Sequence, residues 1–409
     1  MNGEVVNGLS QLLEPHTAEE FLASSWGKTY KHIRGRAGRF ASLLPWERLN
    51  EILRQHRLDF PRLRLMRDGK SLPVTSYLRH TSGGERRKTP IPRLQPVKFT
   101  AELRAGATLV LDAVDELYMP LEELAAELEL LFRERVQINS YAGWHTSRGF
   151  DLHWDDHEVF ILQVTGRKRW RIYGETRPHP LAGDTENPKP ENAPPIWEAT
   201  LEDGDFLYIP RGWWHVAEPL NEPTLHLTVG IHNRTGIDLL QWLAGQLRAE
   251  SVTFRRDLPR FASPAESAAH VARLKEELLG AWDASLLERY FSELDALAEP
   301  RAQLSLPWSA GMGAQEVVIP PDQNTLVHLL APRRLDLKLE AGVVEFSCHK
   351  KRWRFAADAL LVLRRLANGR ACSVAELCEA AKERLDEGTV RAFLGELLRH
   401  GLIAVVVKD

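Results

Sequence analysis

Three potential metal ligands stand out in this sequence. His153 and Asp155 are separated by one residue, and His215 follows later within the segment Gly212-Trp213-Trp214-His215. Residues i and i+2 of a β-strand point to the same face, so a strand here would direct His153 and Asp155 toward one ion. Two imidazoles and a carboxylate suit a first-row metal such as iron, and a facial set of three leaves the opposite side open. The alternative, two surface histidines and a capping aspartate, does not explain so ordered a run.

The residues around the third ligand support this interpretation. An apolar strand, Phe206–Ile209, precedes His215 and predicts that this histidine begins a strand able to cross back over the first pair. The other histidines that might compete as ligands are His145 and His157. Strand alternation would turn the His157 side chain away from that of Asp156, and neither His145 nor His157 is needed to complete the ligand set.

A basic residue shares a face with apolar ones on the next strand pair. The apolar strand 159–164, the turn Thr165-Gly166 and the return strand 167–173 form an expected hairpin. Alternation then places Lys168 on the inward face with Trp170. A buried ammonium is costly unless it is paired with a negative charge. An anionic cosubstrate is one such partner, and an internal salt bridge to a protein carboxylate is the alternative.

Taken together, these motifs resemble the JmjC oxygenases, and more narrowly the ribosomal oxygenases, whose bacterial branch contains the YcfD-type ribosomal-protein arginine hydroxylases. The resemblance lies in His153, Asp155 and the segments 158–163, 166–170, 204–215 and 19–28. It implies that His153, Asp155 and His215 bind iron(II), and that Lys168 pairs with the distal carboxylate of 2-oxoglutarate. Some bacterial relatives carry arginine there, which would grip a carboxylate with two hydrogen bonds where lysine cannot.

The resemblance also implies an activity. It predicts an iron(II)- and 2-oxoglutarate-dependent dioxygenase that uses dioxygen to hydroxylate a ribosomal protein, with an arginine side chain as the first candidate. A histidine side chain and a lysine demethylase reaction remain alternatives. A third alternative, a non-catalytic winged-helix adaptor, conflicts with the intact ligand set and Lys168.

Four further residues are candidates for ligand contact. Asn139 and Tyr141 fall on one face of an upstream strand, and family members with histidine-containing substrates use similar positions for substrate contact. Their presence leaves arginine and histidine both open. His226 and Thr228 follow the last metal ligand and are expected to lie toward the cosubstrate, although His226 could equally be a core residue.

Two groups of charged residues in loops bear on the substrate. A cationic side chain would be attracted by the acidic residues Asp156, Glu158, Asp184, Glu186 and Glu191. A basic loop within 79–93 is either an ordinary solvated surface or a contact for ribosomal RNA, and it contains Arg79, Arg86, Arg87, Lys88 and Arg93.

The composition is that of a globular protein. Of the 409 residues, 44% are hydrophobic and 27% charged, and the net charge of −3 gives no reason to expect whole-molecule attraction to nucleic acid. The three cysteines lack a framework spacing, which favours reduced thiols, a cytoplasmic location and core packing over a zinc site; they are Cys348, Cys372 and Cys378. The first residues lack a signal-peptide pattern, and no apolar stretch approaches membrane length.

The pattern predicts an α+β protein in three sections. The first is a double-stranded β-helix, the jelly roll or cupin architecture of a JmjC domain, preceded by helices. Thr17 and Glu20 form a capping box at an early helix, and residues 79–96 are expected to form a loop. The sections are 1–235 for the catalytic jelly roll, 236–310 for a helical region and 311–409 for a winged helix.

The last two sections invite different roles. Apolar residues recur at helical spacing from Leu239 to Leu294, and the resemblance implies a homodimerisation bundle, with packing onto the chain's own catalytic domain as the alternative. In the third section the third helix is not basic enough to bind phosphates, so protein contact or a structural role is favoured over direct nucleic-acid binding. Its expected elements are the helices 357–366, 373–381 and 387–400 and the strand 402–407.

Overall fold

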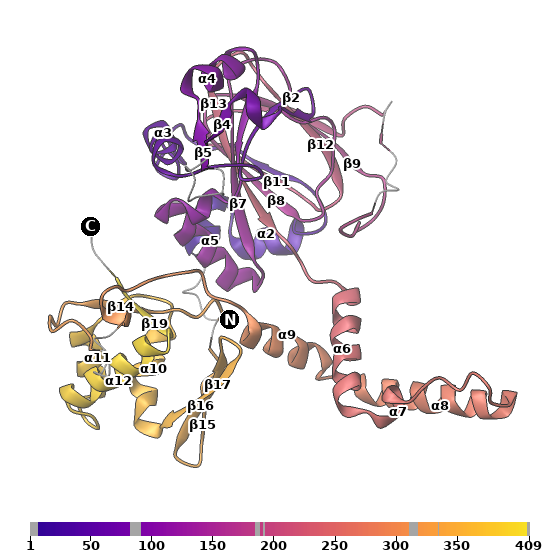
Figure 1. Cartoon of the computed structure of the whole chain (residues 1–409), viewed down its shortest axis with the longest axis vertical. Coiled ribbons are helices and arrows are strands. Elements are labelled where there is room, and N and C mark those ends of the chain that lie inside the picture. Colours follow the sequence, from indigo (N-terminus) through magenta and orange to yellow (C-terminus); the bar gives the residue numbers. More distant parts are fainter. Residues whose placement is uncertain are drawn as a thin grey trace. The chain divides into compact units, whose positions relative to one another are not determined.

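The computed structural model describes residues 7–81, 91–184, 189–190, 193–310, 318–333 and 335–406. The chain divides into two compact units, Met1–Asn233 and Arg234–Asp409, shown in Figure 1. The finer division into three sections remains a prediction. Within the described ranges, no helix combines the length and the apolar character needed to cross a membrane.

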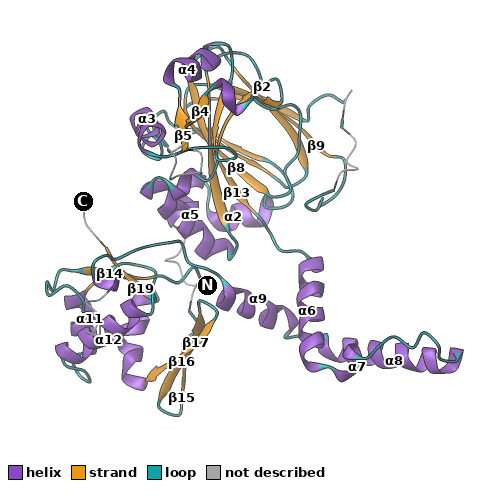
Figure 2. Ribbon diagram, viewed as in Figure 1, coloured by secondary structure: helices purple, strands orange, loops and turns teal. Residues whose placement is uncertain are grey.

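The first unit is built on two antiparallel sheets. The larger has eight strands in the order β1-β11-β8-β13-β7-β6-β2-β3, and the smaller has the order β10-β9-β12. Figure 2 shows the strands of this unit curving around a common centre. The strands of the larger sheet are β1 (Lys31–Ile33), β2 (Leu63–Arg67), β3 (Lys70–Ser71), β6 (Thr108–Leu111), β7 (Val136–Gly143), β8 (Glu158–Thr165), β11 (Phe206–Ile209) and β13 (Thr224–Ile231). Those of the smaller are β9 (Lys168–Glu175), β10 (Trp197–Leu201) and β12 (Trp213–Pro219).

The burial pattern explains this layering. Strand β8 is buried along nearly its whole length, because one face packs on the main core through Phe160 and the other faces the smaller sheet through Ile161. Strand β9 alternates instead, with Lys168 and Trp170 buried and Arg169 exposed. A strand buried on both sides reads as a continuous apolar run, whereas a half-exposed one alternates. The predicted inward direction of Lys168 is therefore confirmed.

Helices cover the outer face of the larger sheet. Phe21 on α2 packs edge-on against Phe160 of β8, with ring centroids 5.9 Å apart. The predicted capping box is confirmed, since Thr17 Oγ1 accepts a hydrogen bond from the Glu20 backbone and the Glu20 carboxylate accepts one from the Thr17 backbone. The helices are α1 (Asn7–Leu13), α2 (Ala18–Ser24), α3 (Trp46–Gln55), α4 (Pro96–Arg104) and α5 (Met119–Phe132).

The loop predicted over residues 79–96 is partly wrong. Strand β4 (Leu78–Thr81) pairs with β5 (Ile91–Leu94), and α4 begins at Pro96. The Arg, Gly and Pro content of this stretch is typical of a loop. Strands β4 and β5 form a separate two-stranded sheet, however, and Pro92 is tolerated there because no further strand needs a hydrogen bond from its backbone nitrogen. Residues 82–90, which include Arg86, Arg87 and Lys88, lie outside the described residues.

The second unit combines a helical stretch with a small mixed α and β region. Its helical stretch contains α6 (Gly236–Glu250), α7 (Val252–Arg255), α8 (Pro264–Ala281) and α9 (Leu286–Leu297), and Ser263 caps α8. The remainder has two three-stranded sheets, β18-β14-β19 and β15-β16-β17. Their strands are β14 (Leu326–Leu329), β15 (Lys338–Glu340), β16 (Val343–Cys348), β17 (Lys351–Ala356), β18 (Cys372–Ser373) and β19 (Ile403–Val406).

The helices expected in the last section are present. They are α10 (Leu360–Leu366), α11 (Val374–Ala381) and α12 (Glu387–Arg399), with a short 3-10 turn, Ala357–Ala359, ahead of the first. Buried residues from all three helices form one core with strands β14, β16 and β19. Cys348 is buried in that core, Cys372 and Cys378 are half-buried, and all three are free thiols.

Candidate active site

The three candidate metal ligands converge between the two sheets. His153 does not lie in a regular strand as predicted; it pairs with His215 through an isolated antiparallel bridge, with N···O distances of 3.2 and 2.8 Å. The register of β12 shifts at Trp214 and His215, the kind of bulge that re-aims a side chain. His215 Nε2 lies 3.5 Å from Asp155 Oδ2, and one donor atom from each of the three residues lies within 4.8 Å of the others.

The backbone fixes which ring nitrogens face one another. His153 Nδ1 lies 2.8 Å from the Asp151 carbonyl oxygen, and His215 Nδ1 lies 2.9 Å from that of Trp213. A carbonyl only accepts, so both Nδ1 atoms carry the proton and both Nε2 atoms present a lone pair. This second contact is typical of histidines that bind metals.

The charges of the set are those that a metal requires. Burial, together with the neighbouring His153, lowers the pKa of His215 to about 4, so its ring is neutral at pH 7. Burial acts to raise the pKa of Asp155, but His215 and His153 outweigh it and the pKa falls below its usual range. The site therefore offers a neutral imidazole at His215 and an ionised carboxylate at Asp155, which are the forms that coordinate a metal.

A cavity of about 250 Å³ opens beside these ligands. All the residues predicted as site residues line it, namely His153, Asp155, His215, Lys168, His226, Thr228, Asn139 and Tyr141. Other lining residues were not predicted, among them Arg64 and Thr108 from β2 and β6 and Phe150 from the loop after β7. Arg64 and Thr108 lie far upstream on strands without a motif, so only the sheet order brings them here.

The cavity also holds a buried lysine, which lies four residues along β9 from Ile172, the strand partner of His215. Lys168 is 6% exposed, and its burial alone lowers the pKa to about 7. Its Nζ lies 5.9 Å from the centre of the Trp170 ring. Among the described residues, no carboxylate lies within ion-pair distance of Lys168, so the predicted alternative of an internal salt bridge finds no support.

Other polar groups near Lys168 are buried without partners. His226 Nδ1 and Trp170 Nε1 make no hydrogen bond within the described part of the chain. His226 stacks on Tyr141, with ring centroids 4.9 Å apart and an interplanar angle of 8°. Burial and the nearby Lys168 charge hold the pKa of His226 well below its usual value, so its ring is neutral. Buried polar atoms are rarely left unsatisfied, which makes this end suited to an anionic ligand that accepts hydrogen bonds.

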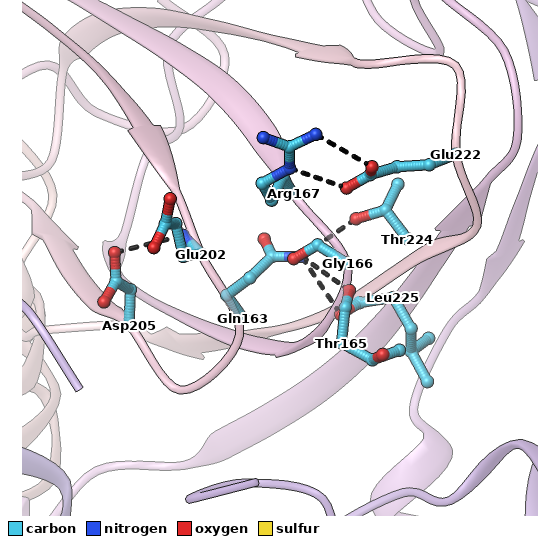
Figure 3. A network of polar contacts seen from close by, with 9 residues as sticks. All are labelled: Gln163, Thr165, Gly166, Arg167, Glu202, Asp205, Glu222, Thr224 and Leu225. Carbon is cyan, nitrogen blue, oxygen red and sulfur yellow. Dashed lines mark hydrogen bonds and ion pairs between the residues drawn. The ribbon is translucent and has the colours of Figure 1, made fainter. Parts of the chain in front are cut away.

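The turn before Lys168 is held by a buried amide. Gln163 Nε2 donates to Thr224 Oγ1 at 2.8 Å and to the Thr165 carbonyl at 3.0 Å, as Figure 3 shows. Gly166 adopts φ +68°, and a Cβ there would lie 2.1 Å from the Pro223 carbonyl oxygen. Because only glycine fits this turn, the start of β9 and the direction of Lys168 depend on it.

The candidate substrate residues have defined partners. Asn139 Oδ1 accepts hydrogen bonds from the Ala113 backbone and from Gln137 Nε2, both at 2.9 Å. Burial raises the pKa of Tyr141, so its phenol is neutral. Arg64 is paired with Asp112, whose carboxylate oxygens lie 2.8 and 2.7 Å from Arg64 Nη2. Asn139 and Tyr141 thus line the cavity as fixed, uncharged polar groups.

Two expectations about charged neighbours are wrong. Glu158 does not face a cationic substrate, because it is buried and accepts hydrogen bonds from the Tyr208 hydroxyl and the Arg211 backbone. His157 does not point away from Asp156: donor atoms of these two residues and of His232 lie within 4.8 Å of one another. The chain bends at 156 and 157, so strand alternation does not apply there.

The remaining neighbours are more ordinary. Two groups of donor atoms converge among the described residues, and His145 belongs to neither of them. Asp184 accepts a hydrogen bond from the Leu181 backbone and pairs with Arg177. Glu186 and Glu191 lie outside the described residues.

The fold and the ligand set together define a class. Two facing antiparallel sheets with a His-x-Asp…His group between them form a cupin-type metal-binding domain. Residues 117–239 match the family described as the JmjC domain. Over these residues the chain is similar to the JmjC domain, and the matched segment includes His153, Asp155, Lys168 and His215.

Individual relatives narrow the likeness. The chain is 30% identical over 258 residues, 61% of its length, to the bifunctional lysine-specific demethylase and histidyl-hydroxylase NO66 of Drosophila pseudoobscura pseudoobscura and, over the same number of residues, to ribosomal oxygenase 1 of Gallus gallus. The matched part is 26% of the first relative and 41% of the second. The fold is that of the ribosomal oxygenase YcfD of Escherichia coli, solved with cobalt and 2-oxoglutarate, at a TM-score of 0.56 and 19% identity, covering 96% of this chain and 99% of that one.

Proposed function

We propose that this protein is an iron(II)- and 2-oxoglutarate-dependent oxygenase that hydroxylates a side chain of a ribosomal protein. The observation that carries the proposal is the cavity itself, which is lined by a two-histidine, one-carboxylate set and by a buried lysine that has no carboxylate within ion-pair distance among the described residues. The names of the sequence relatives and the fold of the YcfD structure agree with it.

Each end of the cavity has a role in this proposal. His153, Asp155 and His215 would hold the iron, which when bound with 2-oxoglutarate supplies the activation of dioxygen. Lys168 would pair with the distal carboxylate of 2-oxoglutarate. Trp170 Nε1, which has no hydrogen-bond partner in the described part of the chain, offers a donor beside it. The protein's own contribution is to orient the reactants and to keep bulk water away from them.

An arginine of a ribosomal protein is the substrate side chain that the sequence pattern favours. A histidine is a second candidate, and the lining of the cavity gives it specific support. Asn139 and Tyr141 line the cavity as uncharged polar groups, and such groups suit a neutral imidazole as hydrogen-bonding partners.

The experiment is an intact-mass comparison of ribosomal proteins from cells with and without this gene. A gain of one oxygen atom on one protein is expected, and peptide sequencing then identifies the modified residue as arginine or histidine. The purified protein with iron(II) and 2-oxoglutarate should reproduce the gain on the unmodified peptide, while Asp155→Ala should not. Formaldehyde release with loss of a methyl group would instead support the demethylase. Absence of any 2-oxoglutarate turnover with ribosomal peptides would favour the non-catalytic adaptor.

We further propose that the helices between 236 and 310 join two copies of the chain. Several large apolar side chains on or beside α8 and α9 are exposed within one chain, and they include Val271 (62%), Leu279 (60%), Trp282 (48%) and Leu287 (55%). Burying this surface in a homodimer would remove apolar area from water. Light scattering should give a dimer mass, and Leu279→Asp with Leu287→Asp should give a monomer that keeps the wild-type circular dichroism.

The last section is proposed to be a winged helix that contacts protein rather than nucleic acid. On α12, Arg391 pairs with Glu387 and Arg399 with Glu396, so much of its basic charge is neutralised within the helix. The free thiols agree with a cytoplasmic protein. Weak or absent binding of ribosomal RNA fragments to the purified protein at physiological salt is the expected result.

A further inference from the structure

A second group of side chains with converging donor atoms follows the first in the chain. One donor atom each from Asp156, His157 and His232 lies within 4.8 Å of the other two. Asp156 and His157 follow the ligand Asp155 directly, and His232 comes just after the end of β13. The first set lies between the sheets, whereas this one includes the exposed His232.

The ring of His157 is oriented like those of the first set. Its Nδ1 lies 3.1 Å from the Glu158 carbonyl oxygen, as the Nδ1 atoms of His153 and His215 lie near carbonyls. The carbonyl requires a proton on Nδ1, which leaves Nε2 as the nitrogen able to bind a cation. Such a backbone contact fixes the tautomer and orientation of a metal-binding histidine.

The neighbouring chain makes room for this arrangement. A Cβ on Gly230 would lie 3.0, 3.2 and 3.4 Å from Cε1, Nδ1 and Nε2 of His157, so the face of the ring rests on a residue without a side chain. The His157 and His232 ring centroids are 4.6 Å apart, and the planes meet at 62°. Two imidazoles packed edge to face bring their nitrogens together without stacking.

We infer that Asp156, His157 and His232 form a second site for a first-row divalent cation such as zinc, distinct from the set His153, Asp155 and His215. Two imidazoles and a carboxylate suit Fe, Co, Ni or Zn, and such sites favour Zn²⁺ over Fe²⁺. Because His232 is exposed, solvent completes the coordination and the ion exchanges readily. This inference does not depend on the proposed hydroxylase activity.

The position of the second site explains why two adjacent aspartates belong to different sets. Asp155 and Asp156 are consecutive, and the bend at 156 and 157 places the second carboxylate beside His157 and His232, whereas the first lies beside His215. His157 contacts both regions, because it also lines the cavity. His232 and Asp156 do not line the cavity, so they can be changed without altering its walls.

The test counts cobalt ions on the full-length, metal-free protein by equilibrium dialysis, with the visible absorption of bound Co²⁺ as a second readout. The wild type should bind two ions per chain. Asp156→Asn with His232→Gln should bind one and keep the absorption band of the first set. Asp155→Ala with His215→Ala should also bind one, with the other band. Combining all four changes should abolish binding, and His145→Gln should still bind two.

Specific outcomes would overturn the inference. One ion on the wild type, or two on Asp156→Asn with His232→Gln, would show that the second group holds no cation. No binding by Asp155→Ala with His215→Ala would do the same, provided that its circular dichroism and unfolding midpoint show it is folded. Loss of 2-oxoglutarate turnover with both ions still bound would contradict only the proposed activity.

Discussion

The two ends of the cavity are built on opposite principles. At the metal end, His153 and His215 are held by a backbone bridge, both Nδ1 atoms are hydrogen-bonded, and Asp155 Oδ2 lies 3.5 Å from His215 Nε2. At the other end, Lys168 is buried without a carboxylate among the described residues, and His226 Nδ1 and Trp170 Nε1 are unpartnered. The first end is complete in the protein alone, and the second is completed by a ligand.

This difference has an energetic meaning. An unpaired buried polar group destabilises a fold by about 1–3 kcal/mol, so a chain gains nothing in stability by keeping such groups. Their presence opposite a metal-binding set indicates that binding a diacid offsets the cost. Variants at the metal end therefore test whether the protein alone positions the metal ligands. Variants at the Lys168 end test whether a bound ligand offsets the cost of the buried polar groups.

Removing a metal ligand should have the largest effect. Asp155→Ala takes away the carboxylate that the two histidines face, and loss of even a supporting contact to a metal ligand lowers affinity or activity by about 10–100-fold. We expect more than about 100-fold loss of 2-oxoglutarate turnover, with iron retention measured in parallel. Turnover within threefold of wild type would mean that Asp155 is not a ligand. His145→Gln, which removes a nearby imidazole outside the set, should leave turnover unchanged.

Replacing the buried cation should separate stability from binding. Lys168→Met keeps the length of the side chain and removes the charge, so the free energy of unfolding without ligand should rise by roughly 1–3 kcal/mol. The dissociation constant for 2-oxoglutarate should increase about 30-fold or more, since losing one partner of a buried charge pair costs at least ~2 kcal/mol. Denaturant titration and calorimetry measure the two quantities. A variant that is less stable and binds 2-oxoglutarate with unchanged affinity would show that Lys168 does not pair with this ligand.

The turn that aims Lys168 should be sensitive to a single methyl group. Gly166→Ala meets the Pro223 carbonyl and has φ +68°, so it should be destabilising and should weaken 2-oxoglutarate binding about tenfold through misdirection of β9, roughly 1.4 kcal/mol. Gly183→Ala is the matched control, because φ is +85° but nothing lies within 4 Å of its Cβ. This control should be destabilised by about 1–2 kcal/mol, because alanine adopts the left-handed backbone conformation poorly, and it should keep its affinity for 2-oxoglutarate. Equal affinities for the two variants would contradict this role of the turn.

The smallest expected effect is on pH dependence. Burial lowers the pKa of Lys168 to about 7, so the free cavity carries this positive charge below pH 7 and loses it above. The affinity for the 2-oxoglutarate dianion should therefore fall about threefold as pH rises from 6.5 to 7.5. Lys168→Arg stays charged throughout this range and should flatten the profile. Parallel profiles for wild type and variant would assign the pH dependence to another group.

Local sequence patterns predict several features of this structure correctly. The capping boxes at Thr17 and Ser263 mark helix starts because a side chain and a backbone N–H a few residues apart satisfy each other. The alternation of β9 correctly turned Lys168 inward, because one face of a strand was buried and the other was not. Alternation failed at Asp156 and His157, where the chain bends, and composition failed at β4 and β5.

The sequence by itself determined the chemistry: the types and spacing of His153, Asp155, His215 and Lys168 already specify a metal and an anion. Tertiary structure decided the surroundings, because sheet order brings Arg64 and Thr108 from distant strands to the same cavity and sets His232 beside His157. Motif spacing encodes contacts between near neighbours in a strand or turn. Contacts between residues far apart in the chain depend on which strands pair, and this is fixed only when the whole core is assembled.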